Sequence, residues 1–276
     1  MDDQRRTGLD HPVDDPVHSG RVINLVWRPK VVQWYYDFVD GVSEDRCVVY
    51  VAVTILDRFC RSIDYDIDER TFELSALSAL FLAVRIGGSV NLELDYLVSM
   101  SRLTISVPDL VHTGTRIINA LKWEQKITTP HDFVRRYDTL LPRKGPLQDR
   151  LRILDTAIYI VEISLCDYCL SRCEPSELSA AAILIALGTS DRSIAQDFSE
   201  ALYLSESIVA GSAAMTKIRS RLIDAYNNST NGIPEDGPTM IEDDQEMEEP
   251  FTSAPHPNLF QPETTNDGIH IILPDL

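Results

Sequence analysis

The chain has 276 residues, a formal net charge of −18 and a hydrophobic fraction of 44%. This length allows one or two domains with sizeable cores, since a domain commonly holds about 150 residues. The negative charge argues against a general nucleic-acid binder, because neutralising phosphates requires clustered Lys and Arg. The longest apolar run, at 180–187, is shorter than the roughly 18 residues of a membrane span, so no membrane partner is expected.

Composition, together with a break near 128–130, divides the chain into four segments. Residues 1–20 are polar and predict a flexible leader, without the apolar core of a signal peptide. Residues 21–127 and 128–227 carry apolar side chains at spacings of three and four, which predicts helices in both segments. Residues 228–276 contain eleven acidic residues, seven prolines and neither Lys nor Arg, so we expect a disordered acidic tail.

Helices are expected along both central segments, because alternating strand patterns are scarce. The predicted helices cover residues 48–59, 74–84, 110–123, 149–165, 175–187, 193–202 and 205–226. Gly87-Gly88 suits a helix end, whereas Pro175 and the stretch from Ser106 to Asp109 suit helix starts. A break near 128–130 separates the two segments. The expected fold class is all-α, with two tandem bundles of about five helices each.

Short motifs follow one another in a fixed order in the first central segment. They are Trp27-Arg28-Pro29-Lys30-Val31-Val32-Gln33-Trp34, Ile55-Leu56-Asp57-Arg58-Phe59, Ala79-Leu80-Phe81-Leu82-Ala83-Val84-Arg85, Ile117-Ile118-Asn119-Ala120-Leu121-Lys122-Trp123 and Thr129-Pro130-His131-Asp132-Phe133. Their order and spacing together resemble the N-terminal box of the cyclin family. Residues 161–187 are similar, less specifically, to the C-terminal cyclin box, and the resemblance covers residues 21–227.

The resemblance implies a regulatory subunit that binds and activates a cyclin-dependent protein kinase in cell-cycle control, in the nucleus and cytoplasm. Such a protein is not itself an enzyme and needs no cofactor, and the sequence has no phosphate-binding loop and no nucleophile elbow. The alternative is a cyclin-fold adaptor or divergent cyclin that does not activate a kinase, in a transcription-related or scaffold role.

The resemblance also assigns kinase-binding positions. The family's Lys at the end of the third helix of the box corresponds to Arg85, which keeps the positive charge with a different geometry. The family's Glu in the fifth helix corresponds to Gly114, and its acidic pair after the Lys corresponds to Gly87-Gly88. Three nearby side chains are either apolar contacts to a kinase helix or part of the core of the box: Ile86, Ile117 and Ile118.

Two further assignments concern the first helix of the box. The resemblance implies a buried structural ion pair between Arg28 and Asp57. Trp27, Val31 and Trp34 lie at i, i+4 and i+7, on one helix face. They are either core residues or, as the resemblance implies, a partly exposed apolar patch that recruits short substrate motifs. Of the three, only Trp34 matches the family's usual residue.

Five cysteines, an odd number, are typical of free thiols in a reducing intracellular compartment. Cys166, Cys169 and Cys173 lie on one helix face. A structural zinc site needs four ligands, and no fourth Cys or His lies within local reach, so no metal is expected. We therefore expect the three to be buried structural thiols.

Turnover signals are a further hypothesis. The tail at 228–276 is either an inert solvated extension or a degradation-promoting segment, because it is rich in Pro, Glu, Asp, Ser and Thr. Arg6 and Leu9 in the leader have the spacing of a minimal destruction box.

Overall fold

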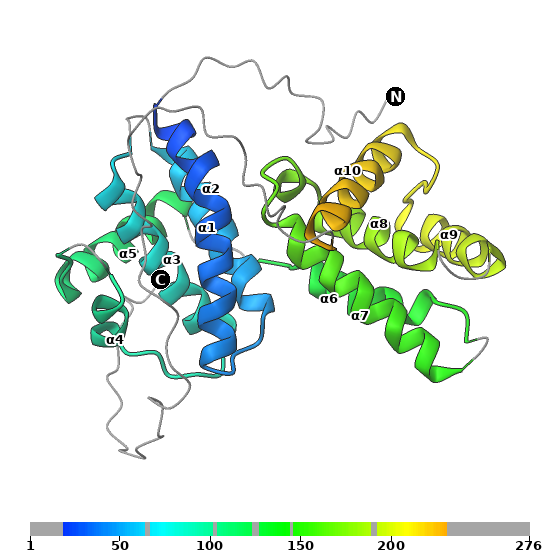
Figure 1. Ribbon diagram of the computed structural model, residues 1–276, viewed down its shortest axis with the longest axis horizontal. Coiled ribbons are helices and arrows are strands. Elements are labelled where there is room, and N and C mark those ends of the chain that lie inside the picture. Colours follow the sequence, from blue (N-terminus) through cyan, green and yellow to red (C-terminus); the bar gives the residue numbers. More distant parts are fainter. Residues whose placement is uncertain are drawn as a thin grey trace.

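The computed structural model describes residues 19–63, 67–101, 104–122, 127–143, 146–188 and 192–230, and these residues form an all-helical molecule (Figure 1). The all-α prediction is confirmed. Most of the predicted leader and acidic tail lies outside the described residues, and so do Arg6, Leu9 and Trp123.

The first bundle holds the helices α1 to α5. Their bounds are Ser19–Gly41, Cys47–Ser62, Glu69–Gly87, Leu94–Ser99 and Val107–Leu121. The helix α2 is the centre of this bundle, because it packs against α1, α3 and α5. Most of its side chains from Val48 to Phe59 are buried, as the apolar stripe predicted.

The second bundle holds the helices α6 to α10, beside the first bundle in Figure 1. Their bounds are Pro130–Tyr137, Leu147–Ser164, Pro175–Leu187, Arg192–Glu206 and Ala213–Thr230. Short 3-10 turns lie at Asp138–Leu140 and Leu170–Arg172. The helix α8 is the centre here, because it packs against α6, α7, α9 and α10 and is apolar on nearly all sides.

Side-chain caps fix several helix starts. The predicted start at Ser106 is a capping box, in which Ser106 and Asp109 bind each other's backbone N–H. Thr129 and Asp132 form the same motif at the start of α6. Asp68 caps α3 by accepting a hydrogen bond from the backbone N–H of Thr71. Local sequence therefore determines where these helices begin.

Several helix boundaries differ from the sequence prediction, and α3 begins at Glu69 rather than at 74. The expected helix at 205–226 is wrong in its first part, because α9 ends at Glu206 and α10 begins at Ala213. Ser207 has a φ of 57°, in the left-handed region where a helix cannot continue. Ser212 then accepts a hydrogen bond from the backbone N–H of Met215 and starts α10. Near the start of the chain, α1 begins at Ser19, within the predicted leader, and continues through Pro29.

The ion pair between Arg28 and Asp57 is present and joins α1 to α2. Arg28 donates from Nε to both carboxylate oxygens at 3.3 Å and from Nη2 to Oδ2 at 3.0 Å. Both side chains are buried. The second bundle contacts the pair, since Ser171 Oγ lies 3.5 Å from Asp57 Oδ2 and the Tyr168 ring lies 6.0 Å from the guanidinium. The pair therefore links α1 to α2 inside the first bundle and also contacts the second bundle.

Replacing Asp57 with Ala is expected to lower the free energy of unfolding by about 3–5 kcal/mol, because a buried guanidinium loses its counter-charge. Urea denaturation measures the loss. The control is Arg70→Ala, which removes the half-exposed Arg70–Asp109 pair and is expected to cost about 0–1 kcal/mol. A loss for Asp57→Ala no larger than the control would contradict the assigned role.

Candidate functional site

The C-terminal end of α3 presents a positive charge and an apolar side chain to solvent. Arg85 is exposed in the last turn, and its Nη1 donates to Oδ1 of Asn91 at 3.4 Å. The next residue, Ile86, is 47% exposed. Exposed apolar side chains mark a protein-binding surface when several of them form one patch.

The helix α5 packs against α3, and Ser78 on α3 donates to the backbone carbonyl of Leu110 on α5 at 3.2 Å. Val111 on α5 is 50% exposed, and none of the sequence motifs includes it. Its position three residues before Gly114, on one face of the helix, is a signal that could have found it. We use the name α3–α5 face for Arg85 and Ile86 on α3 and Val111 and Gly114 on α5; Gly114 is buried and the other three are exposed.

Gly114 lies in a buried stretch of α5, yet a Cβ built on it would meet no atom within 4 Å. The glycine is therefore not required by packing. Of the other isoleucines considered, Ile117 is fully buried in the core, so the core alternative holds for it. Ile118 is half-buried.

The glycine pair after Arg85 has a structural reason at one of its two positions. A Cβ on Gly88 would lie 2.6 Å from the carbonyl oxygen of Val84 and 2.8 Å from Oε2 of Glu44. A Cβ on Gly87 would meet nothing within 4 Å. The absence of a side chain at Gly88 therefore makes room for the Glu44 carboxylate, which comes from the turn between α1 and α2.

Glu44 is buried and binds the loop that follows α3. Its Oε2 accepts hydrogen bonds from the backbone N–H groups of Ser89 and Val90, each at 2.7 Å. Burial raises the pKa of Glu44, but hydrogen bonds from the N–H groups of Asp45, Val90 and Ser89 outweigh it, so the pKa is lowered overall. No local sequence pattern indicates Glu44, because the loop it binds lies 45 residues away along the chain.

The predicted patch at Trp27, Val31 and Trp34 is not an exposed surface. The three side chains are 5%, 1% and 5% exposed and belong to the core of the first bundle. Trp27 packs edge-on against Phe72 of α3. The three are therefore core residues, and the expectation of a partly exposed substrate-docking patch at these positions is wrong.

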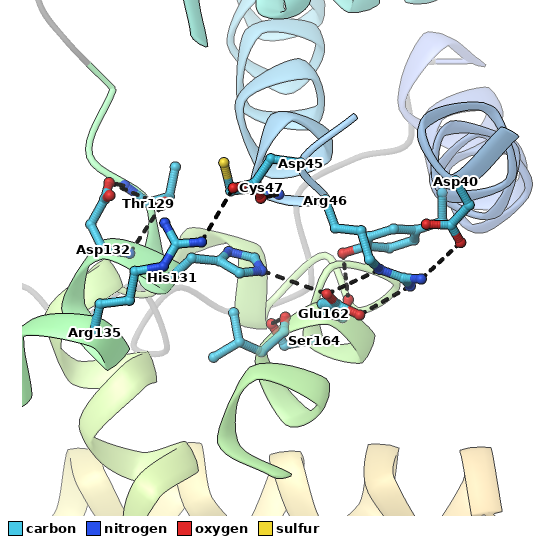
Figure 2. Close-up of polar contacts among 12 residues, drawn as sticks. Asp40, Asp45, Arg46, Cys47, Thr129, His131, Asp132, Arg135, Glu162 and Ser164 are labelled. Carbon is cyan, nitrogen blue, oxygen red and sulfur yellow. Dashed lines mark hydrogen bonds and ion pairs between the residues drawn. The ribbon is translucent and has the colours of Figure 1, made fainter. Parts of the chain in front are cut away.

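A network of charges joins the two bundles (Figure 2). Arg46 donates to Asp40 Oδ2 at 2.8 Å and to Glu162 Oε1 at 3.1 Å, and its guanidinium lies 4.5 Å from the Tyr36 ring centre. His131 Nε2 lies 3.7 Å from Glu162 Oε1. Glu162 on α7 is therefore one of the points of the second bundle that bind the first bundle.

The cysteines are free thiols, but they are not uniformly buried as expected. Cys173 is buried, Cys169 is half-buried and Cys166 is exposed. Burial raises the pKa of Cys173 to about 12, so this thiol stays protonated at neutral pH.

Among the described residues, no cluster of His, Cys, Asp and Glu has the arrangement of a metal site. In the same part of the chain, none of the helices is long and apolar enough to cross a membrane.

Two family models match adjoining parts of the chain. The model of the N-terminal domain of cyclin matches residues 5–126, and that of the C-terminal domain matches residues 128–219. The chain belongs to the cyclin family. The resemblance drawn from the motifs is thereby confirmed. The boundary between the two matches lies at the break between the first and second bundles of this cyclin.

Relatives with similar sequences include mitotic cyclins. G2/mitotic-specific cyclin-1 of Medicago sativa subsp. varia is 26% identical over 165 residues, which cover 59% of this chain and 36% of the relative. G2/mitotic-specific cyclin-A1 of Caenorhabditis elegans is 23% identical over 164 residues, covering 59% and 32%. This cyclin spans about two fifths of the length of the plant relatives it matches.

Solved structures share the fold of this cyclin. A viral cyclin from herpesvirus saimiri superposes with a TM-score of 0.59 at 17% identity, over 74% of this chain and 88% of that chain. A chain of the CAK complex from Chaetomium thermophilum, bound to ATP-gamma-S, gives a TM-score of 0.57 at 14% identity, over 74% and 63%. At these identities the likeness establishes the two-bundle architecture.

The two glycines after Arg85 provide a matched test of the site. Gly88→Ala is expected to lower the free energy of unfolding by about 1–3 kcal/mol, because the new methyl overlaps Val84 and Glu44. Gly87→Ala is the control and is expected to change it by less than about 0.5 kcal/mol, because the space there is open. Thermal or urea unfolding measures both, and equal effects would contradict the proposed fit between Gly88 and Glu44.

Proposed function

We propose that this cyclin binds a cyclin-dependent protein kinase through the α3–α5 face and activates it in cell-cycle control, in the nucleus and cytoplasm. The observation that carries the proposal is the pair of exposed apolar residues, Ile86 and Val111, on two helices that pack against each other. The mitotic names of several relatives support the assignment to cell division.

The face has the chemistry needed to bind a helix of another protein. Ile86 and Val111 provide apolar area that association would remove from water. Arg85 provides guanidinium donors for carbonyl or carboxylate groups of the partner. Such a contact would hold the regulatory helix of a kinase inward, where its Glu pairs with the Lys that binds ATP phosphates. Activation is then mechanical, and the catalytic groups belong to the kinase.

An adaptor role without kinase activation is the second candidate, and Gly114 is the observation that favours it. The family's carboxylate is absent at this position, and packing does not require the glycine. Binding to a kinase would then rest on Arg85 and the apolar residues alone. Because the Trp27 face is buried, recruitment of short substrate motifs there is not part of either proposal.

Affinity purification of the tagged full chain, followed by identification of bound kinases, tests the proposal. Ile86→Asp is expected to weaken binding of the recovered kinase by tenfold or more, about 1.4 kcal/mol, because a charge would enter an apolar contact. Leu204→Asp, at a position 75% exposed on α9, is the control and should keep the wild-type affinity. Recovery of no kinase, or equal losses for both variants, would overturn the proposed surface.

Restoring the missing carboxylate separates the two candidates. Gly114→Glu is expected to strengthen kinase binding relative to Gly114→Ala, which adds a Cβ without a charge. Both substitutions should raise helix stability by up to about 1 kcal/mol, so the comparison isolates the carboxylate. Calorimetric titration with the purified kinase measures the difference, and an assay of kinase activity shows whether activation follows. No gain for Gly114→Glu over Gly114→Ala favours the adaptor.

A further inference from the structure

Three consecutive residues in the turn between α1 and α2 each bind a different part of the molecule. Glu44 binds the loop that follows α3. Asp45 accepts a hydrogen bond from Arg135 on α6 at 3.2 Å. Arg46 binds Glu162 on α7. One short turn therefore contacts both the end of α3 and two helices of the second bundle, and Figure 2 shows the contacts to the second bundle.

The contact made by Glu44 is a dense one. Besides the N–H groups of Ser89 and Val90, its carboxylate accepts from the backbone N–H of Asp45 at 2.9 Å and from the Ser89 hydroxyl at 3.3 Å. Hydrogen bonds to an ionised acceptor are roughly twice as strong as neutral ones. The N–H groups of Ser89 and Val90 lie beyond the last turn of α3, so the carboxylate determines the path of the chain there.

This loop carries the residue that Arg85 contacts. Asn91 follows Val90 directly, and its Oδ1 accepts the hydrogen bond from Arg85. We propose that Glu44 is a positioning residue for the Arg85 end of the α3–α5 face, and that Asp45 and Arg46 link this position to the docking of the second bundle. The consequence for kinase binding rests on the proposed function, whereas the anchoring of the loop does not.

The link to the second bundle depends mainly on Arg46. Its guanidinium forms two contacts to Glu162, at 3.1 Å and 3.0 Å, while Asp40 and the Tyr36 ring hold it on the side of α1. Tyr36 also donates to the backbone carbonyl of Glu162 at 3.4 Å. Because Glu162 is buried, removing Arg46 takes away the guanidinium that balances the charge of its carboxylate. The contact between the turn and α7 is then weakened.

Hydrogen exchange of individual amides, followed by NMR in the free protein, tests the anchoring. Glu44→Ala is expected to speed exchange at Ser89 and Val90 by about tenfold, because both N–H groups lose their acceptor. Glu44→Gln keeps one acceptor oxygen and should give a smaller increase. The control is Asp68→Ala, which removes a carboxylate cap at the opposite end of α3. Unchanged exchange at Ser89 and Val90 in both Glu44 variants would overturn the proposal.

The link between the turn and the second bundle is tested by a double-mutant cycle in the same assay. Arg46→Met is expected to speed exchange at Ser89 and Val90 by about threefold in the wild-type background. The same substitution should add nothing when combined with Glu44→Ala, since the loop is then already released. An unchanged rate in Arg46→Met, or a full additional effect in the double variant, would show that the second bundle does not act through Glu44.

The last experiment measures the affinity of the same variants for the kinase. Glu44→Ala is expected to weaken binding about fivefold or more, and Asp68→Ala should leave it unchanged although it also costs stability. If the wild-type chain binds no kinase, the proposed function fails while the exchange data still decide the anchoring. If the kinase binds and Glu44→Ala frees the loop without weakening binding, the positioning role is wrong.

Discussion

The buried ion pair between Arg28 and Asp57 is the interaction on which the rest of the architecture depends. It joins α1 to the central helix of the first bundle, and its outer side contacts Tyr168 and Ser171 of the second. Removing one partner of a buried ion pair is strongly destabilising, because the remaining charge has no counter-charge. The two helices are thus held in one relative position, and the turn that connects them, which carries Glu44 and Arg46, is held with them.

That turn binds both the loop after α3 and the second bundle. The residues of the α3–α5 face lie at the end of one helix and in the middle of another, so their geometry depends on the loop after α3. Glu44 fixes this loop from outside the helix, and Gly88 provides the space for it. A carboxylate contributed by a distant turn thus stands beside Gly87-Gly88, where the family commonly has an acidic pair.

The substitutions on the face differ in their physical consequences. Arg85 keeps the charge of the family's Lys and remains exposed, so a donor for a partner is still present. At Gly114 the family's carboxylate is absent, although a Cβ there would meet no atom within 4 Å. The absence of the carboxylate therefore changes what the surface can bind, and packing does not require it. Ile86 on α3 and Val111 on α5 are exposed apolar side chains on two helices that pack against each other.

The sequence by itself determined the helical class, the two bundles and the starts of α5 and α8, because these depend on local periodicity and on residues at the helix ends, while the family resemblance implied the Arg28–Asp57 pair. Only the tertiary structure decided which apolar residues are exposed: it buried Trp27, Trp34 and Ile117 and exposed Val111 and Cys166. It also revealed Glu44, whose partners are 45 residues away. Exposure and long-range hydrogen bonds depend on how whole helices pack, and a pattern along one helix does not specify its neighbours.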